Sequence, residues 1–398
     1  MNNIICSLPF NSVSIDPRGG LRACCNSDSV TFRENIASIS VDEIINGPSI
    51  KSLRRSFLKG EKDPICSRCW KMEEINNKSF RTIANEDEDF GLATIPEDRF
   101  KVDIGYQDLR YLDITLGNKC NLACRMCHPG SSSLIAKQFN QLGYPVHGSE
   151  LIEFDRAGRD KLLQVIRQAP NLSAIYLLGG EPLINDFHDE ILDLLLEHDR
   201  AKNVTIHYST NLHSDIEKHL EKWKKFKSIV LSVSIDGSGS VYEYIRWPGS
   251  WNKVYTNLQK VHELAQNHKN IHAMVAVTAQ NLNVQNLPEL IQEIQKIDSM
   301  LSFYFIPVTG GNYLTMTPTE TLEQAIKDLS LLQDPSNRIP ELINYYKDAL
   351  DKKSAITKEQ VAGFFKKQKD FDGLRKQNLF KTMPHFIQLA NEYNIELW

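Results

Sequence analysis

Eight cysteines are the residues of this 398-residue chain whose type and spacing most directly suggest chemistry. They are Cys6, Cys24, Cys25, Cys66, Cys69, Cys120, Cys124 and Cys127. Because 41% of the residues are hydrophobic, the chain can bury a large core and does not need the disulfide framework of a small secreted domain. Scattered structural thiols would occur along the whole chain, whereas clustered cysteines indicate metal binding.

The last three cysteines have the spacing C-x3-C-x2-C. Three thiolates on one short loop can each hold one iron of a cubane cluster, which leaves the fourth iron open to a substrate. A closed zinc site would need a fourth nearby Cys or His, and His128 is too close in sequence to complete a tetrahedron easily. The spacing therefore favours a catalytic iron–sulfur cluster held by Cys120, Cys124 and Cys127.

Residues 110 to 308 alternate between short apolar segments and amphipathic helices, which predicts repeated βαβ units and a parallel sheet. The expected strands are Tyr111–Leu116, Ala174–Leu178, Val204–Tyr208, Ile229–Ile235, His272–Thr278 and Ser302–Pro307. The expected helices are Ser132–Leu142, Asp186–Glu197, Ser214–Lys224, Trp251–Asn267 and Leu287–Ile297. Six units are too few for a closed eight-fold barrel, so an open partial barrel and a doubly wound sheet both fit the pattern.

Polar segments follow several of these strands, where α/β folds place their ligand sites. They contain Gly179, Gly180, Glu181 and Pro182, then Ser209 and Asn211, and finally Ser234, Asp236 and Arg246. Each segment alone is typical of a helix cap or a turn. Together with the cysteine loop they favour one binding rim, in which Glu181 accepts from an ammonium group and Arg246 binds a carboxylate.

With these motifs in place, the chain resembles a radical S-adenosylmethionine enzyme over roughly residues 108 to 310. The resemblance implies a partial (β/α)6 TIM-like barrel, a [4Fe–4S] cluster on Cys120, Cys124 and Cys127, and S-adenosylmethionine contacts from Gly179–Glu181, Ser234 and Arg246. It also implies reductive cleavage of S-adenosylmethionine to a 5′-deoxyadenosyl radical, with an electron donor such as flavodoxin or ferredoxin. Met126 stands where the family commonly has an aromatic residue near adenine.

The five remaining cysteines form a second set. Asp16–Gly20 separates two short strands, Ser12–Ile15 and Leu21–Cys24, and predicts a hairpin. This segment resembles a twitch or SPASM auxiliary-cluster domain, placed before the barrel instead of after it. The resemblance implies a second iron–sulfur cluster, of the [4Fe–4S] type, on Cys6, Cys24, Cys66 and Cys69, with Cys25 as the spare. A zinc ribbon is the alternative.

These segments predict a small α+β auxiliary domain over residues 1–105, the partial barrel over 106–315 and a helical C-terminal extension over 316–398. The net charge of −4 gives no argument for a nucleic-acid partner, and no stretch approaches the roughly 20 apolar residues of a membrane span. We therefore expect a cytoplasmic protein.

The sequence is compatible with three functions. The auxiliary domain favours radical chemistry on a peptide or protein side chain. The same chemistry on a sugar or nucleoside is the first alternative, and an iron–sulfur redox sensor or electron carrier is the second. Six residues are candidates for lining a substrate cavity, without an assigned role: His207, Tyr208, Tyr242, Trp247, Tyr304 and Asn312.

Overall fold

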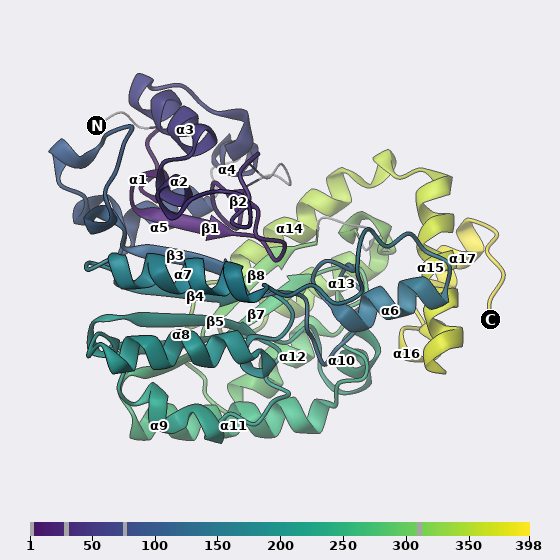
Figure 1. Ribbon diagram of the computed structural model, residues 1–398. Coiled ribbons are helices and arrows are strands. Elements are labelled where there is room, and N and C mark those ends of the chain that lie inside the picture. Colours follow the sequence, from purple (N-terminus) through teal and green to yellow (C-terminus); the bar gives the residue numbers. More distant parts are fainter. Residues whose placement is uncertain (1–3, 28–31, 75–77, 309–312) are drawn as a thin grey trace. The chain divides into compact units, whose positions relative to one another are not determined.

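The computed structural model describes residues 4–27, 32–74, 78–308 and 313–398. Its strands are hydrogen-bonded in the order β2-β1-β3-β4-β5-β6-β7-β8 (Figure 1). Their bounds are β1 Ser12–Ile15, β2 Leu21–Arg22, β3 Tyr111–Thr115, β4 Ala174–Leu178, β5 Thr205–Thr210, β6 Ser228–Ser234, β7 Ile271–Ala279 and β8 Phe303–Pro307. The α/β class and all six strands expected between residues 111 and 307 are therefore confirmed.

The chain divides into two compact units, each made of several segments. The first comprises Met1–Cys120, Ser149–Ser209 and Ile216–Val230. The second comprises Asn121–Gly148, Thr210–Asp215 and Leu231–Trp398. The three candidate cluster cysteines are thus divided, because Cys120 belongs to the first unit while Cys124 and Cys127 belong to the second.

In the first unit, the predicted hairpin is present and is also part of the larger sheet. β1 pairs antiparallel with β2, and the Asp16 carboxylate closes the turn by accepting from the Gly20 amide at 2.9 Å. On its other side β1 pairs parallel with β3, with Ser12 opposite Tyr111. The hairpin was predicted from the sequence, but its pairing with β3 was not.

The helices of the first unit flank these strands. They are α1 Leu8–Asn11, α2 Val41–Asn46, α3 Pro48–Lys59, α4 Ser67–Glu74, α5 Phe80–Glu86, α7 Arg156–Gln168, α8 Asp186–Glu197 and α9 Leu220–Trp223. α8 has the predicted bounds, whereas α7 was not predicted. The expected helix over Ser214–Lys224 is wrong in extent, since a 3-10 turn, Glu217–His219, precedes the short α9.

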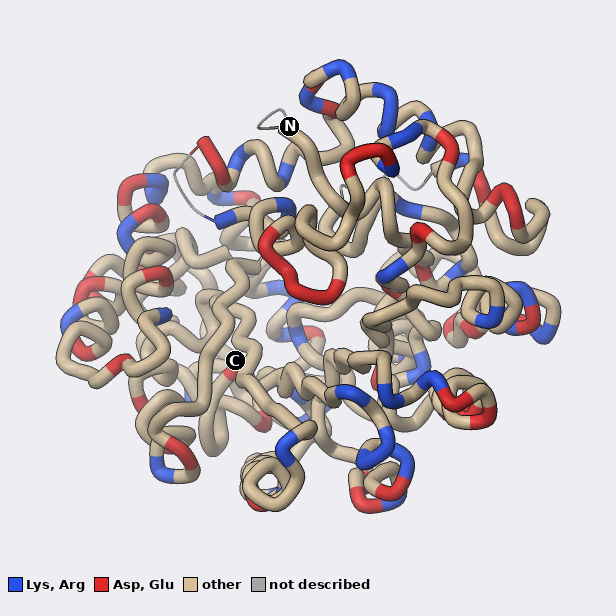
Figure 2. The backbone as a smooth tube through the Cα atoms, turned by 90° about the vertical axis from the view of Figure 1, so that its left-hand side faces the viewer, with Lys and Arg blue, Asp and Glu red and all other residues tan. Residues whose placement is uncertain are grey.

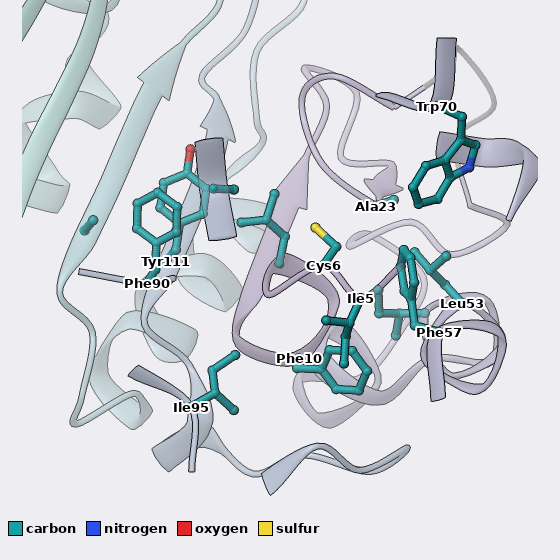
Figure 3. Close-up of a cluster of buried hydrophobic side chains, with 14 residues drawn as sticks. Ile5, Cys6, Phe10, Ala23, Leu53, Phe57, Trp70, Phe90, Ile95 and Tyr111 are labelled. Carbon is teal, nitrogen blue, oxygen red and sulfur yellow. The ribbon is translucent and has the colours of Figure 1, made fainter. Parts of the chain in front are cut away.

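A hydrophobic cluster joins the N-terminal helices of the first unit to its strands (Figure 3). Phe57 meets Trp70 edge to face, with ring centroids 6.3 Å apart. Phe90 stacks on Tyr111 of β3 at 4.2 Å. Cys6 lies inside this cluster, so its thiol is surrounded by apolar side chains (Figure 3).

The second unit contains the remaining helices and a separate core. The helices are α6 Ser133–Gln141, α10 Gly239–Ile245, α11 Trp251–Asn267, α12 Leu287–Gln295, α13 Thr319–Ser330, α14 Ile339–Asp351, α15 Lys358–Arg375, α16 Leu379–Thr382 and α17 Phe386–Glu392. The helical tail is therefore confirmed. Its longest helix, α15, begins at a capping box in which Thr357 and Gln360 satisfy each other's backbone amides.

Charged residues of both signs are interspersed along the chain (Figure 2). Within the part of the chain that the structure describes, we find no helix with the length and apolar character needed to cross a bilayer.

Arg54 is a buried cation that connects three parts of the N-terminal region. Its guanidinium is fully buried and donates to the backbone carbonyls of Pro9, Ile45 and Val102. We expect Arg54→Met to lower the free energy of unfolding by about 3 kcal/mol, because the substitution leaves these buried carbonyls without donors. Urea unfolding of this variant and of Arg55→Met, which alters an exposed neighbour, measures the difference.

Candidate functional site

In the second unit, the loop that carries Cys124 and Cys127 is bonded to the segment that follows α10. The Ala123 amide donates to the Trp247 carbonyl at 2.6 Å, and the Arg125 amide donates to the Ile245 carbonyl at 2.8 Å. These two bonds lie on either side of Cys124. They place Arg246 beside it, with Nη1 of the guanidinium 3.8 Å from the Cys124 Sγ.

A buried ion pair holds Arg246 in this position. Its Nη2 lies 2.7 Å from Oδ2 of Asp236, a residue two positions after the end of β6. The other oxygen of Asp236 accepts from the Thr278 amide of β7 at 2.6 Å. Burial raises the pKa of Asp236, although Arg246 opposes this shift. Burial also disfavours the charged guanidinium, but Asp236, Cys124 and Tyr242 together outweigh that effect and raise the pKa of Arg246.

In the first unit, the turn after β4 lies against the backbone that precedes Cys120. Gly179 and Gly180 have φ angles of +84° and +47°, which a side chain disfavours. A Cβ on Gly180 would lie 2.0 Å from the Lys119 carbonyl oxygen. This close approach explains why glycine is required, since any side chain would push the turn away from the start of the cysteine loop.

Glu181 extends this contact. Its amide donates to the same Lys119 carbonyl at 2.8 Å, and its carboxylate accepts from the Leu183 amide at 3.2 Å, just after Pro182. The Glu181 side chain is fully buried. A buried carboxylate next to the cysteine loop is suited to binding an ammonium group, because burial strengthens such a pair.

The other predicted rim residues occupy different surroundings. Asn211 donates to Asn121 Oδ1 at 2.7 Å and so contacts the cysteine loop of the second unit. Ser234 ends β6 and is half-buried, and Ser209 lies within β5. Met126 packs against the hydrophobic cluster of the C-terminal tail.

Among the candidates for a substrate cavity, Tyr208 and Tyr242 are fully buried and belong to the core. His207, Trp247 and Tyr304 are half-buried. Asn312 lies outside the described residues.

The auxiliary cysteines gather around one cavity in the first unit. Cys6, Cys24, Cys66 and Cys69 all line it, together with Arg81 and four other residues. Cys25 does not line this cavity. Its amide donates to Oδ2 of Asp113 at 2.7 Å, and its thiol is hydrogen-bonded to the same buried carboxylate. Asp113, which the sequence did not single out, therefore contacts Cys25, whereas the adjacent Cys24 lines the cavity.

Burial disfavours the thiolate form of five of the candidate ligand cysteines. Burial raises the pKa of Cys6 and of Cys127 to about 12 each, and it raises the pKa of Cys24, Cys66 and Cys124 as well. A coordinated metal deprotonates its thiol ligands, so metal binding would offset this cost. The donor set is therefore suited to soft, thiolate-binding metals such as iron–sulfur clusters or zinc.

Two family models match this chain. The Radical SAM superfamily model matches residues 114–294, and the SPASM model, described as an iron-sulfur cluster-binding domain, matches residues 6–70. Each match contains one of the two cysteine sets. The first domain implies a [4Fe–4S] cluster and S-adenosylmethionine, and the second implies an additional iron–sulfur cluster.

The chain is also similar to a protein of Methanocaldococcus jannaschii named probable GTP 3′,8-cyclase, with 22% identity over 219 residues. That match covers 54% of this chain and 66% of the relative, slightly less than two thirds of its length. A solved structure of anSMEcpe with bound AdoMet has a TM-score of 0.41 at 16% identity, covering 56% of this chain and 57% of that one. Streptococcus suis SuiB bound to S-adenosylmethionine has a TM-score of 0.37 at 14% identity, covering 67% and 53%.

The cysteine loop, the glycine turn and the N-terminal cysteine cavity thus fall within the two matched domains. The chain therefore carries a radical SAM domain, matched over residues 114–294, and a SPASM iron–sulfur domain on the N-terminal side of it, matched over residues 6–70.

Proposed function

We propose that this protein cleaves S-adenosylmethionine reductively at a [4Fe–4S] cluster held by Cys120, Cys124 and Cys127, and that it acts on a peptide or protein side chain. The observation that carries the first half of this proposal is the position of Arg246. A guanidinium beside Cys124, held by the buried Asp236, is suited to binding a carboxylate next to the iron that lacks a cysteine ligand.

The residues present fit these cofactors. Arg246 Nε is buried and has no hydrogen-bond partner among the described residues, so it is available to a carboxylate of a bound ligand. When bound, the cluster and S-adenosylmethionine together supply a 5′-deoxyadenosyl radical that abstracts hydrogen from a substrate. Glu181 would hold the ammonium group of the cofactor and Arg246 its carboxylate, while Gly179 and Gly180 would allow close approach of the backbone.

For the auxiliary site we propose a second [4Fe–4S] cluster on Cys6, Cys24, Cys66 and Cys69. Four thiolates are enough to bind all four irons, so this cluster would have no open position for a substrate. The engagement of Cys25 by Asp113 supports Cys24 as the ligand. Zinc bound by the same four thiolates is the alternative.

For the substrate, the SPASM match favours a peptide or protein side chain. For the partner, we propose an external electron donor such as flavodoxin or ferredoxin, because reductive cleavage consumes an electron. The similarity to a probable GTP 3′,8-cyclase supports a nucleotide as the second candidate. Incubation with GTP, S-adenosylmethionine and a reductant separates them, because consumption of GTP would support the nucleotide and contradict the peptide.

The first prediction concerns cofactor cleavage. Anaerobically reconstituted protein given S-adenosylmethionine and a strong reductant should release 5′-deoxyadenosine, measured by chromatography. Cys124→Ala should abolish the release, because it removes a cluster ligand. Arg246→Ala should weaken S-adenosylmethionine binding by roughly 2–5 kcal/mol, since it also leaves Asp236 buried and unpaired. An intact cluster that releases no 5′-deoxyadenosine would refute the proposed activity.

The second prediction concerns metal content. Iron and sulfide analysis of the reconstituted protein should give about eight irons per chain. Cys24→Ser should lower this number to about four, because three remaining thiolates hold the auxiliary cluster poorly, whereas Cys25→Ser should leave it unchanged. About four irons with one zinc in the wild-type protein would show that the auxiliary site is a zinc site.

The third prediction concerns the glycine turn. Gly180→Ala should prevent stable assembly of the cluster at Cys120, because the new Cβ would overlap the Lys119 carbonyl. Gly143→Ala is a matched control, since Gly143 also has a positive φ, +73°, but nothing lies within 4 Å of its added Cβ. The control should show only the backbone cost of about 1 kcal/mol and normal iron content. Equal iron content in both variants would refute the proposed role of this turn.

A further inference from the structure

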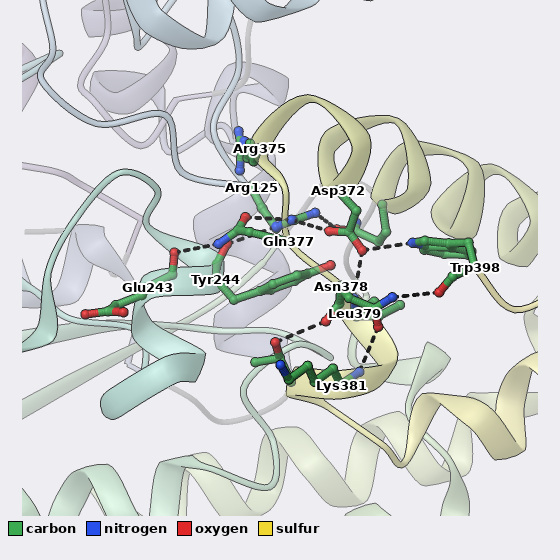
Figure 4. Close-up of polar contacts among 12 residues, drawn as sticks. Arg125, Glu243, Tyr244, Asp372, Arg375, Gln377, Asn378, Leu379, Lys381 and Trp398 are labelled. Atoms are coloured by element: carbon green, nitrogen blue, oxygen red, sulfur yellow. Dashed lines mark hydrogen bonds and ion pairs between the residues drawn. The ribbon is translucent and has the colours of Figure 1, made fainter.

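The C-terminal helix α15 contacts the cysteine loop through the residue after Cys124. The Arg125 side chain is fully buried, and its Nη1 donates to Gln368 Oε1 at 2.7 Å. Its Nη2 donates to Asp372 Oδ1 at 2.6 Å. The guanidinium also lies over the Tyr244 ring, 3.5 Å from its centroid, so Arg125 is held on several sides (Figure 4).

Asp372 is held in turn by the segment that follows α15. Its Oδ2 accepts from the Leu379 amide at 2.7 Å and from the indole Nε1 of Trp398 at 3.0 Å. Figure 4 shows these two donors and Arg125 converging on one carboxylate. Three donors on a carboxylate that is 2% exposed fix its position firmly.

An arginine of α15 itself, Arg375, reaches the other side of Cys124. Arg375 Nη2 donates to the Ala123 carbonyl at 2.8 Å and to Gln138 Oε1 at 2.7 Å. Its Nη1 is buried without a hydrogen-bond partner among the described residues. Cys124 therefore lies between two residues, Ala123 and Arg125, that are both bonded to α15.

Met126 adds an apolar contact in the same direction. Its side chain packs against the tail cluster that includes Phe364, Phe365 and Phe386. The residues on both sides of the second cysteine, Ala123, Arg125 and Met126, are thus bonded to, or packed on, the C-terminal extension. A tail that merely covered the fold would not need two buried arginines at this loop, because burying them is costly unless they are paired.

We propose that α15 is part of the cluster site, and that Asp372 and Arg375 are positioning residues for Cys124 and Cys127. Asp372 acts through the Arg125 guanidinium, and Arg375 acts through the Ala123 carbonyl. Together they hold the loop so that its two thiols keep their positions whether or not a cluster is bound. This inference rests on the proposed function, because the positioned thiols are the proposed cluster ligands.

The test compares Asp372→Asn with Asp370→Asn. The Asp372→Asn substitution replaces one carboxylate oxygen with an NH2 group, which cannot accept from the donors around it. It also removes the negative charge that pairs with Arg125. Asp370 lies on the same helix and pairs with Lys366 at 2.8 Å in a partly exposed position, so its substitution is the matched control. In cluster-free protein, hydrogen exchange of residues 121–127 should be about tenfold faster for Asp372→Asn, and unchanged for the control.

In reconstituted protein, the reduced cluster of Asp372→Asn should give an altered electron paramagnetic resonance spectrum and a smaller change on adding S-adenosylmethionine. Circular dichroism, together with cooperative unfolding in urea, reports whether the variant has folded. If Asp372→Asn fails to fold, the double variant Arg125→Met with Asp372→Leu is used instead, because it removes both charges together. It should likewise accelerate exchange and alter the spectrum.

Wild-type exchange rates and an unaltered spectrum in a folded variant would overturn the positioning role. Failure of the proposed function would look different, because in that case the wild-type protein itself would hold no cluster whose spectrum responds to S-adenosylmethionine. Arg375→Met provides an independent arm. It should accelerate exchange at Ala123 and Cys124, and exchange equal to that of wild type would refute the part assigned to Arg375.

Discussion

Burial of charge around Cys124 is the constraint on which the second unit depends. Two guanidinium–carboxylate pairs are buried near this residue, Arg246 with Asp236 and Arg125 with Asp372. An unpaired buried charge would be strongly destabilising, so each pair keeps its partners in place. One pair fixes the cysteine loop to the strands β6 and β7 through Asp236 and Thr278, and the other fixes it to α15.

The first unit uses backbone geometry where the second uses charge. The Gly179–Gly180 turn reaches the Lys119 carbonyl because neither residue has a Cβ. At the auxiliary cavity the two adjacent cysteines have different contacts, since the Cys25 amide donates to Asp113 while Cys24 lines the cavity. The glycine turn and the Asp113 contact are both present without a bound cofactor, so the cysteines already lie in different environments in the apoprotein.

The strands from β3 to β8 could be predicted from the sequence because each is a short apolar run bounded by turn residues. α7 was missed because its first half is mostly polar and its large apolar residues, from Leu162 to Ile166, are confined to the second half. The pairing of β1 with β3 was also missed. It joins residues about 100 positions apart, as in Ser12 and Tyr111, and a local pattern carries no information about such a partner.

In the candidate site, too, local sequence patterns reveal compact motifs but not contacts between distant residues. The cysteine spacing, the glycine turn and Arg246 are visible in sequence because each belongs to a compact motif. Arg125 looked like any surface arginine, and Asp372 lies 247 positions away, so nothing local connects them. Desolvation reveals their connection, because a fully buried guanidinium next to a cysteine loop needs an anionic partner. Among the described residues, Asp372 of the tail helix is that partner. The C-terminal extension is thereby tied to the chemistry of the loop and not only to the stability of the fold.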